Sequence, residues 1–114
     1  MSRAAHYANQ DLTRAEVDAM RGPTVLEFGA TWCPICQGAQ PVIEQALDGR
    51  GWRHLLVEDG SGRPLGRSFQ IKLWPTLVFL QDGQEVARVV RPASLEDIAA
   101  ASGRQADGAR PVAN

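Results

Sequence analysis

The sequence has only two cysteines and two histidines among its 114 residues. Two thiolates cannot complete the tetrahedral ligand set of a structural zinc ion. The histidines, His6 and His54, lie far apart in the sequence, with no second Cys-x-x-Cys pair to join them. A disulfide between cysteines only three positions apart would close too small a loop to stabilise the fold much. We therefore predict no metal site, while a structural disulfide or two inert thiols stay open as alternatives.

Clusters of like charge and long apolar runs are also missing. The net charge is −1, and the basic residues, eleven arginines and Lys72, are scattered along the chain. This distribution predicts no binding surface for nucleic acid or for an anionic membrane. No apolar run approaches the length of about 18 residues that a membrane helix needs, and the N-terminus lacks the apolar segment of a signal peptide. We predict a cytoplasmic monomer without a membrane partner, or a periplasmic one if a signal sequence has been removed.

The two cysteines lie together in the segment Trp32-Cys33-Pro34-Ile35-Cys36. One thiolate with a second thiol in reach can attack a disulfide, form a mixed disulfide and be released by ring closure. A buried structural cysteine needs no such neighbour. The spacing therefore predicts two-electron redox chemistry.

The residues around the cysteines predict a strand followed by a helix. Residues 24–30 are apolar and rich in strand formers, and apolar residues recur with helical spacing from Ala39 to Leu47. Cys33 would then lie at the N-terminus of the helix, where free amides and the helix dipole favour a thiolate, and Pro34 suits the first turn. We predict that Cys33 is the exposed nucleophile and that Cys36, one turn further, is the buried resolving thiol.

An acidic residue, Glu27, interrupts the apolar strand before the cysteines. Its carboxylate could lie in water at the edge of a sheet. Alternatively, it could point beneath the cysteines and exchange a proton with Cys36. We favour this proton relay.

The rest of the pattern predicts alternating helices and strands. Helices are expected over 13–21, 33–48, 63–71 and 94–101, with a kink at Pro41, and strands over 24–30, 52–58, 76–81 and 84–90. Asp82-Gly83 predicts a two-residue hairpin between the last two strands, and residues 6–8 could add a weak edge strand. This order predicts an α/β fold with a mixed sheet and helices on both faces.

Taken together, these motifs resemble the thioredoxin family from about Leu12 to Ala101. The features that match in order and spacing are the Trp-Cys-x-x-Cys segment, Pro41 in the following helix, Trp74-Pro75-Thr76 and the Asp82-Gly83 hairpin. The resemblance implies a thioredoxin fold with a four- to five-stranded sheet. Length and composition predict one domain over 1–102, and the polar, Gly- and Pro-bearing end predicts a disordered tail over 103–114. It also implies that the Trp74-Pro75 bond is cis and that Glu27 corresponds to the family's buried acid.

The same resemblance implies a thiol-disulfide oxidoreductase that reduces protein disulfides through a redox-active Cys33–Cys36 disulfide, with no other cofactor. Its partners would be disulfide-containing client proteins and a flavoprotein reductase that supplies electrons. The residues expected to contact the substrate lie around the cysteines and in two later loops: Trp32, Pro34, Ile35, Trp74, Pro75, Val90 and Arg91.

Several departures from the family pattern keep other functions open. Pro-Ile replaces Gly-Pro between the cysteines, and Leu56 occupies the position of the basic partner of the buried acid. The glycine of the family's docking surface is replaced near Val90-Arg91-Pro92. The bulky Trp74 also precedes the expected cis proline. We therefore expect Glu27 to be poorly paired. The alternatives are an oxidase, an isomerase or a client-specific reductant on the same fold, and a peptide-binding module without catalysis.

Overall fold

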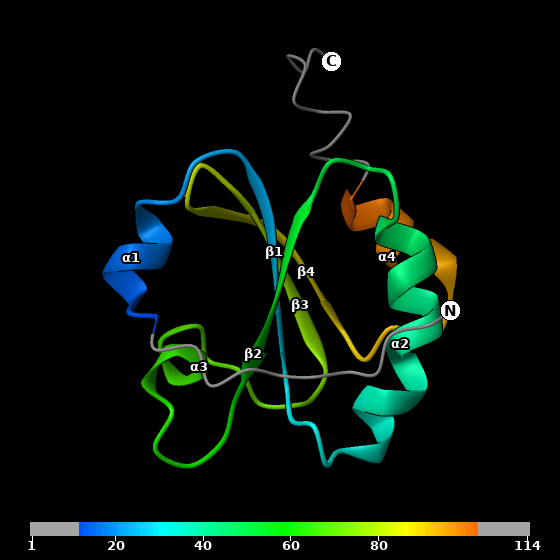
Figure 1. Cartoon of the computed structure of the whole chain (residues 1–114), viewed down its shortest axis with the longest axis horizontal. Helices are drawn as coiled ribbons and strands as arrows, with labels where there is room; N and C mark the ends of the chain where they lie inside the picture. The colour runs from blue at the N-terminus through cyan, green and yellow to red at the C-terminus, as the bar shows by residue number, and fades with distance from the viewer. Residues whose placement is uncertain (1–11, 103–114) are drawn as a thin grey trace.

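The computed structural model describes residues 12–102 and contains a four-stranded sheet in the order β2-β1-β3-β4 (Figure 1). Its strands are β1 (Pro23–Gly29), β2 (Arg53–Glu58), β3 (Thr76–Gln81) and β4 (Gln84–Val90). β1 pairs in parallel with β2 and antiparallel with β3, and β3 pairs antiparallel with β4. The sheet is therefore mixed, as predicted. The possible edge strand at 6–8 and the tail at 103–114 lie outside the described residues.

Helices cover both faces of this sheet (Figure 1). The helices are α1 (Arg14–Asp18), α2 (Pro34–Leu47), α3 (Pro64–Ser68) and α4 (Leu95–Ser102). α2 and α4 pack on one face, where Ile43 and Ile98 are buried with Phe79. α1 and α3 pack on the other face, where Val17 and Leu65 join Phe28. Burial of these apolar faces is the main force that holds the layers together.

Local signals explain where most elements begin. Thr13 and Glu16 form a capping box at the start of α1. Asp97 Oδ2 accepts hydrogen bonds from the amides of Ala93 and Ser94 at the start of α4. α2 continues through Pro41 as one element. The helices expected over 13–21 and 63–71 are shorter than predicted, ending at Asp18 and Ser68, so these two predicted ends are wrong. For α3 the reason is the backbone of Gln70, whose φ of 58° is incompatible with a continuing helix.

The hairpin between β3 and β4 has the predicted two-residue turn. Asp82 and Gly83 have φ values of 51° and 81°, the left-handed conformation that such a turn requires. Asp82 Oδ1 accepts a hydrogen bond of 2.8 Å from the amide of Gly22, and this bond is the main reason that the pKa of Asp82 is lowered. The turn is thereby attached to the loop before β1.

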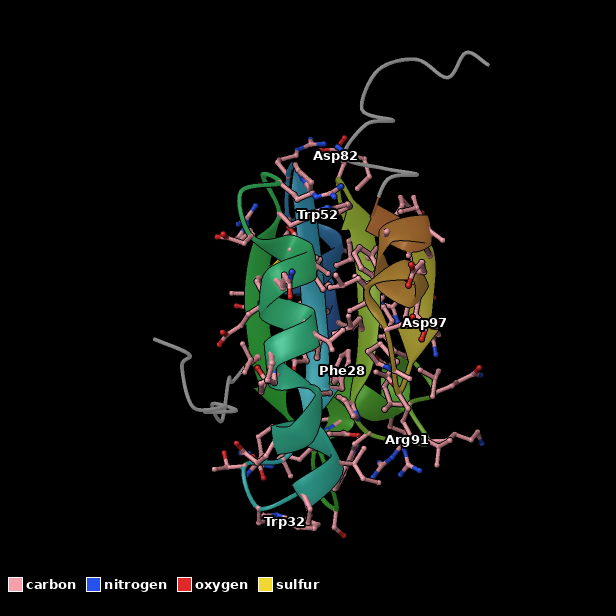
Figure 2. The ribbon with its side chains drawn as sticks, turned by 90° about the vertical axis from the view of Figure 1, so that its right-hand side faces the viewer. Phe28, Trp32, Trp52, Asp82, Arg91 and Asp97 are labelled. Carbon is pink, nitrogen blue, oxygen red and sulfur yellow. The ribbon has the colours of Figure 1, made fainter. Side chains whose placement is uncertain are left out.

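The topology brings four loops to one end of the sheet. The parallel strands β1 and β2 end there, and the antiparallel arrangement places the start of β3 and the end of β4 beside them. Figure 2 shows Trp32 and Arg91 at this end and Trp52 and Asp82 at the opposite one. Among residues 12–102, no helix is long and apolar enough to cross a membrane.

Candidate active site

The thiol pair lies at the N-terminus of α2. Cys33 is the N-cap residue, and its Sγ accepts a hydrogen bond of 3.2 Å from the amide of Cys36. Pro34 occupies the first turn, as predicted. Both cysteines are present as thiols rather than as a disulfide. The thiolate is the attacking form of cysteine, and Cys33 lies at the start of the helix with its sulfur hydrogen-bonded to a helix amide.

Cys33 is more enclosed than the sequence suggested. Cys33 is 6% exposed and Cys36 is 0% exposed, so the order of accessibility is as predicted but the expectation of an exposed Cys33 is wrong. The reason is tertiary, since Trp74 and Leu56 pack against the small cluster formed by the cysteines and Ala30.

Trp74 forms a wall of the site. The bond between Trp74 and Pro75 is cis, as the family resemblance implied. The indole Nε1 of Trp74 donates a hydrogen bond of 2.8 Å to Asp59 Oδ2, and its ring makes an edge-on contact with Trp32 at a centroid distance of 5.4 Å. Trp74 is thus held from two sides against the thiols.

Asp59 is a site residue that the sequence analysis did not select. A methyl group at Gly66, in α3, would lie 2.0 Å from Asp59 Oδ1. The absence of a side chain at Gly66 therefore makes room for the carboxylate that holds Trp74. A glycine inside a short helix, where alanine is normally better, was the sequence signal for such a close approach.

We expect Gly66→Ala to lower the free energy of unfolding by about 1 to 2 kcal/mol, because the methyl group must displace Asp59 and break its hydrogen bond to Trp74. Denaturant unfolding followed by tryptophan fluorescence measures both the stability and the environment of the indole. Gly38→Ala is the matched control, since nothing lies within 4 Å of a methyl group there. In that exposed helical position alanine should be neutral or stabilise by up to about 1 kcal/mol. A stabilising Gly66→Ala would contradict the role of Asp59.

Glu27 is fully buried in the central strand β1. The alternative of a solvated edge position is therefore wrong. Its Oε1 lies 2.7 Å from Nε2 of His54, and its Oε2 accepts a hydrogen bond of 2.5 Å from Gln40 Nε2. The expectation of a poorly paired acid is also wrong, because His54 supplies a basic partner from β2. His54 lies two residues before Leu56, on the same face of the strand, and this alternation was the signal available in the sequence.

Gln40 connects this buried acid to the resolving cysteine. Its side-chain amide donates to Glu27 Oε2 and also, at 3.3 Å, to the backbone carbonyl of Cys36. Gln40 is itself buried in α2, so the contacts are shielded from water. The carboxylate, the amide and the thiol-bearing turn therefore form one connected unit beneath the active end.

Arg91 follows β4 and contacts the backbone around the cis bond. Its amide donates to the carbonyl of Pro75 and its Nε donates to the carbonyl of Trp74, both at 2.8 Å. Its φ of 50° is the left-handed conformation that normally favours glycine. The two hydrogen bonds offset part of the cost of this conformation for arginine.

An apolar rim surrounds these groups. Trp32 is 71% exposed and Ile35 48% exposed, and Val90 stands beside Thr76, the residue that follows Pro75. Leu73, which the sequence analysis did not select, is also an exposed large hydrophobic residue. All the substrate-contact residues expected from the sequence thus come from the loops, the strand end and the first turn of α2 at this end of the sheet. Among residues 12–102, no group of three His, Cys, Asp or Glu side chains could hold a metal ion.

Comparison with known proteins agrees with this geometry. A family model described as thioredoxin matches residues 5–102. The chain belongs to the thioredoxin family. The structure of thioredoxin 2 from Pseudomonas aeruginosa PAO1 in its reduced form is 49% identical, with a TM-score of 0.82, over 92% of this chain and 98% of that one. The fold is therefore the α/β thioredoxin fold, with a four-stranded mixed sheet among the described residues.

Curated members of the thioredoxin family match over shorter stretches. The bifunctional thioredoxin reductase/thioredoxin of Mycobacterium leprae is 35% identical over 78 residues, which are 67% of this chain and 17% of that protein. The thioredoxin of Mycobacterium tuberculosis is 36% identical over 70 residues, which are 60% of each protein. The chain thus spans less than two thirds of the length of either relative.

Proposed function

We propose that this chain is a thiol-disulfide oxidoreductase that reduces disulfides in client proteins. The observation that carries the proposal is the geometry of the thiol pair. The Sγ of Cys33 accepts the amide of Cys36 at the start of α2, beside the cis peptide bond of Trp74-Pro75. Family membership supports the same reaction, because Cys33 and Cys36 occupy the Trp-Cys-x-x-Cys segment.

The reaction proceeds in two exchanges. The Cys33 thiolate attacks one sulfur of the client disulfide, the client S–S bond breaks, and the other client sulfur leaves as a thiolate that takes up a proton. Cys36 then loses its proton and attacks Cys33 Sγ, which releases the second client thiol and leaves a Cys33–Cys36 disulfide. Two electrons from a reductase return the pair to dithiol.

We assign Glu27 the role of proton acceptor for Cys36 in the second exchange. The carboxylate is linked through Gln40 to the Cys36 turn, and on its other side it faces His54. The side chain of His54 is 14% exposed, so it offers a route from the buried carboxylate to water. His54 acts as a positioning residue, because it holds the carboxylate rather than the reacting sulfurs.

The partners follow from the same proposal. The apolar rim of Trp32, Ile35, Leu73 and Val90 would bind the client segment around its disulfide. A flavoprotein thioredoxin reductase would supply the electrons. The Mycobacterium leprae relative, whose name joins a thioredoxin reductase to a thioredoxin, supports that choice.

Insulin reduction by dithiothreitol tests the proposal. We expect the wild type to accelerate the reaction and Cys33→Ser to abolish the acceleration, because serine cannot attack a disulfide. A wild type that binds insulin without turnover would instead support a peptide-binding module. Equilibration of the pair with glutathione then separates a reductant from an oxidase, since about 30 mV changes the two-electron equilibrium tenfold.

A further inference from the structure

The indole of Trp74 lies between the thiols and open space. It packs against the cluster formed by Ala30, Cys33 and Cys36, and it also lines a pocket of about 260 Å³. The ring is therefore half-buried, with the thiol cluster as one neighbour and unfilled space as another. Packing alone does not keep such a ring in one place, because it can turn into space that no side chain fills.

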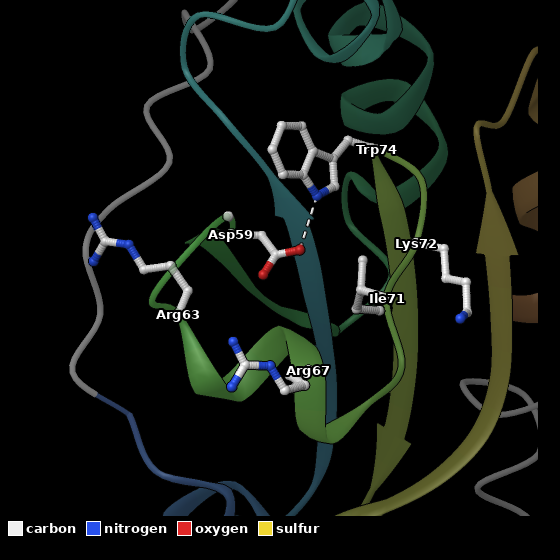
Figure 3. Close-up of a pocket in the computed structure, with 7 residues that line it drawn as sticks. Asp59, Arg63, Arg67, Ile71, Lys72 and Trp74 are labelled. Carbon is white, nitrogen blue, oxygen red and sulfur yellow. Dashed lines mark hydrogen bonds between the residues drawn. The ribbon is translucent and has the colours of Figure 1, made fainter.

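A hydrogen bond to Asp59 restrains the ring within this space. The indole Nε1 donates to Asp59 Oδ2 at 2.8 Å, and Figure 3 shows the N–H directed at this carboxylate, which lines the same pocket. A hydrogen bond to a carboxylate is one of the stronger kinds in proteins. The edge contact with the ring of Trp32 is a weaker restraint, because Trp32 is itself largely exposed.

Asp59 is fixed by its own contacts. Its backbone amide donates a hydrogen bond of 2.8 Å to the carbonyl of Gly29, the last residue of β1. Its carboxylate lies against the backbone of Gly66 in α3, where a side chain would collide with it. The acceptor of the indole N–H is thus held by a strand and a helix of the scaffold, so it can fix the position of Trp74.

We infer that Asp59 is a positioning residue that keeps Trp74 over Cys33 and thereby limits the access of disulfides to the nucleophile. This inference rests on the proposed thiol-disulfide exchange and adds a residue that controls its first step. Cys33 is 6% exposed, which leaves little room for a second sulfur, so attack on a client requires this cover to move. Asp59 acts through the indole, because a stronger hydrogen bond lowers the population in which the ring has turned away.

Alkylation of Cys33 by iodoacetamide tests the inference without a client. Every variant is made in Cys36→Ser, so that Cys33 is the only thiol. The rate is followed to a pH at which this thiol is fully ionised, because the plateau rate excludes differences in thiolate fraction. We expect Asp59→Ala to raise the plateau rate about fivefold, as the loss of a hydrogen bond to a charged group allows. Asp59→Asn should keep the rate of the parent, since its carbonyl oxygen still accepts the indole N–H.

A double-mutant cycle assigns the effect to the hydrogen bond. Trp74→Phe keeps an aromatic ring but has no N–H donor, so it should also raise the plateau rate. Asp59→Ala should add little to Trp74→Phe, because both remove the same bond. Asp48→Ala is the matched control, since it removes an exposed acid at the end of α2 and should leave the rate unchanged. An Asp59→Ala rate equal to that of this control, or full additivity of the two substitutions, would overturn the inference.

A small disulfide connects this access to the proposed reaction. When Cys33 attacks the disulfide of β-mercaptoethanol, one molecule of β-mercaptoethanol leaves and the other stays as a mixed disulfide. This reagent is too small to use the apolar rim, so Asp59→Ala should speed its reaction by the same factor as alkylation. Faster alkylation without faster formation of the mixed disulfide would overturn the inference. Absence of any mixed disulfide in the Cys36→Ser parent would instead contradict the proposed function.

Discussion

Cys36→Ser is expected to capture client proteins on Cys33 and to lower insulin reduction by at least about a thousandfold. The first exchange needs only the Cys33 thiolate, which keeps its place at the start of α2. The second exchange is intramolecular, and intramolecular groups act at effective concentrations far above those of an added thiol. Without Cys36, only dithiothreitol from solution can attack the mixed disulfide and release the client.

Mass spectrometry of the trapped adduct measures this outcome directly. An adduct of Cys36→Ser with the client should form and should disappear on reduction. Cys33→Ser is the control, since it should form no adduct through position 33. If Cys36→Ser reduces insulin at a rate close to that of the wild type, Cys36 is not the resolving thiol.

The second large effect concerns the pair formed by Glu27 and His54. We expect His54→Leu to lower the free energy of unfolding by about 3 kcal/mol, because it leaves a fully buried carboxylate without its basic partner. The value is at the low end of the range for buried pairs, since the His54 side chain is 14% exposed. Urea unfolding at pH 7 measures it.

Glu27→Gln separates the charge from the shape of this buried group. A glutamine oxygen can still accept from Gln40 and its amide can still donate to His54, so we expect a change of no more than about 1 kcal/mol. The double variant should be more stable than His54→Leu alone, because no buried charge is left unpaired. Equal instability of the single and double variants would contradict the ion pair.

The same variant tests the proton relay. Glu27→Gln cannot accept the proton of Cys36, so resolution of a preformed mixed disulfide should slow by about a hundredfold at neutral pH. The initial attack by Cys33, measured by the rate of mixed disulfide formation, should change much less. A wild-type rate of resolution in Glu27→Gln would show that the carboxylate takes no part in the chemistry.

Local patterns in the sequence were sufficient to predict the hairpin strands and the starts of the helices α1 and α2. The hairpin strands at 76–81 and 84–90 match the prediction at both ends, because Asp82-Gly83 demands a particular turn and strong strand formers flank it. The starts of two helices are also local features: the capping residues of α1, and Cys33 as the N-cap of α2 with Pro34 in its first turn. Each of these depends on residues a few positions apart.

Other features of the site were decided by the tertiary structure, because they join residues that are far apart in the sequence. The hydrogen bonds from Gln40 and His54 to Glu27, from Trp74 to Asp59 and from Arg91 to Trp74 join residues 13 to 27 positions apart. No spacing rule along one helix or strand predicts such pairs, because chain folding decides which strand ends and loops meet. Burial of Cys33 follows from how the loops meet at one end of the sheet. The pairing of Glu27 with His54 follows from the parallel register of β1 and β2.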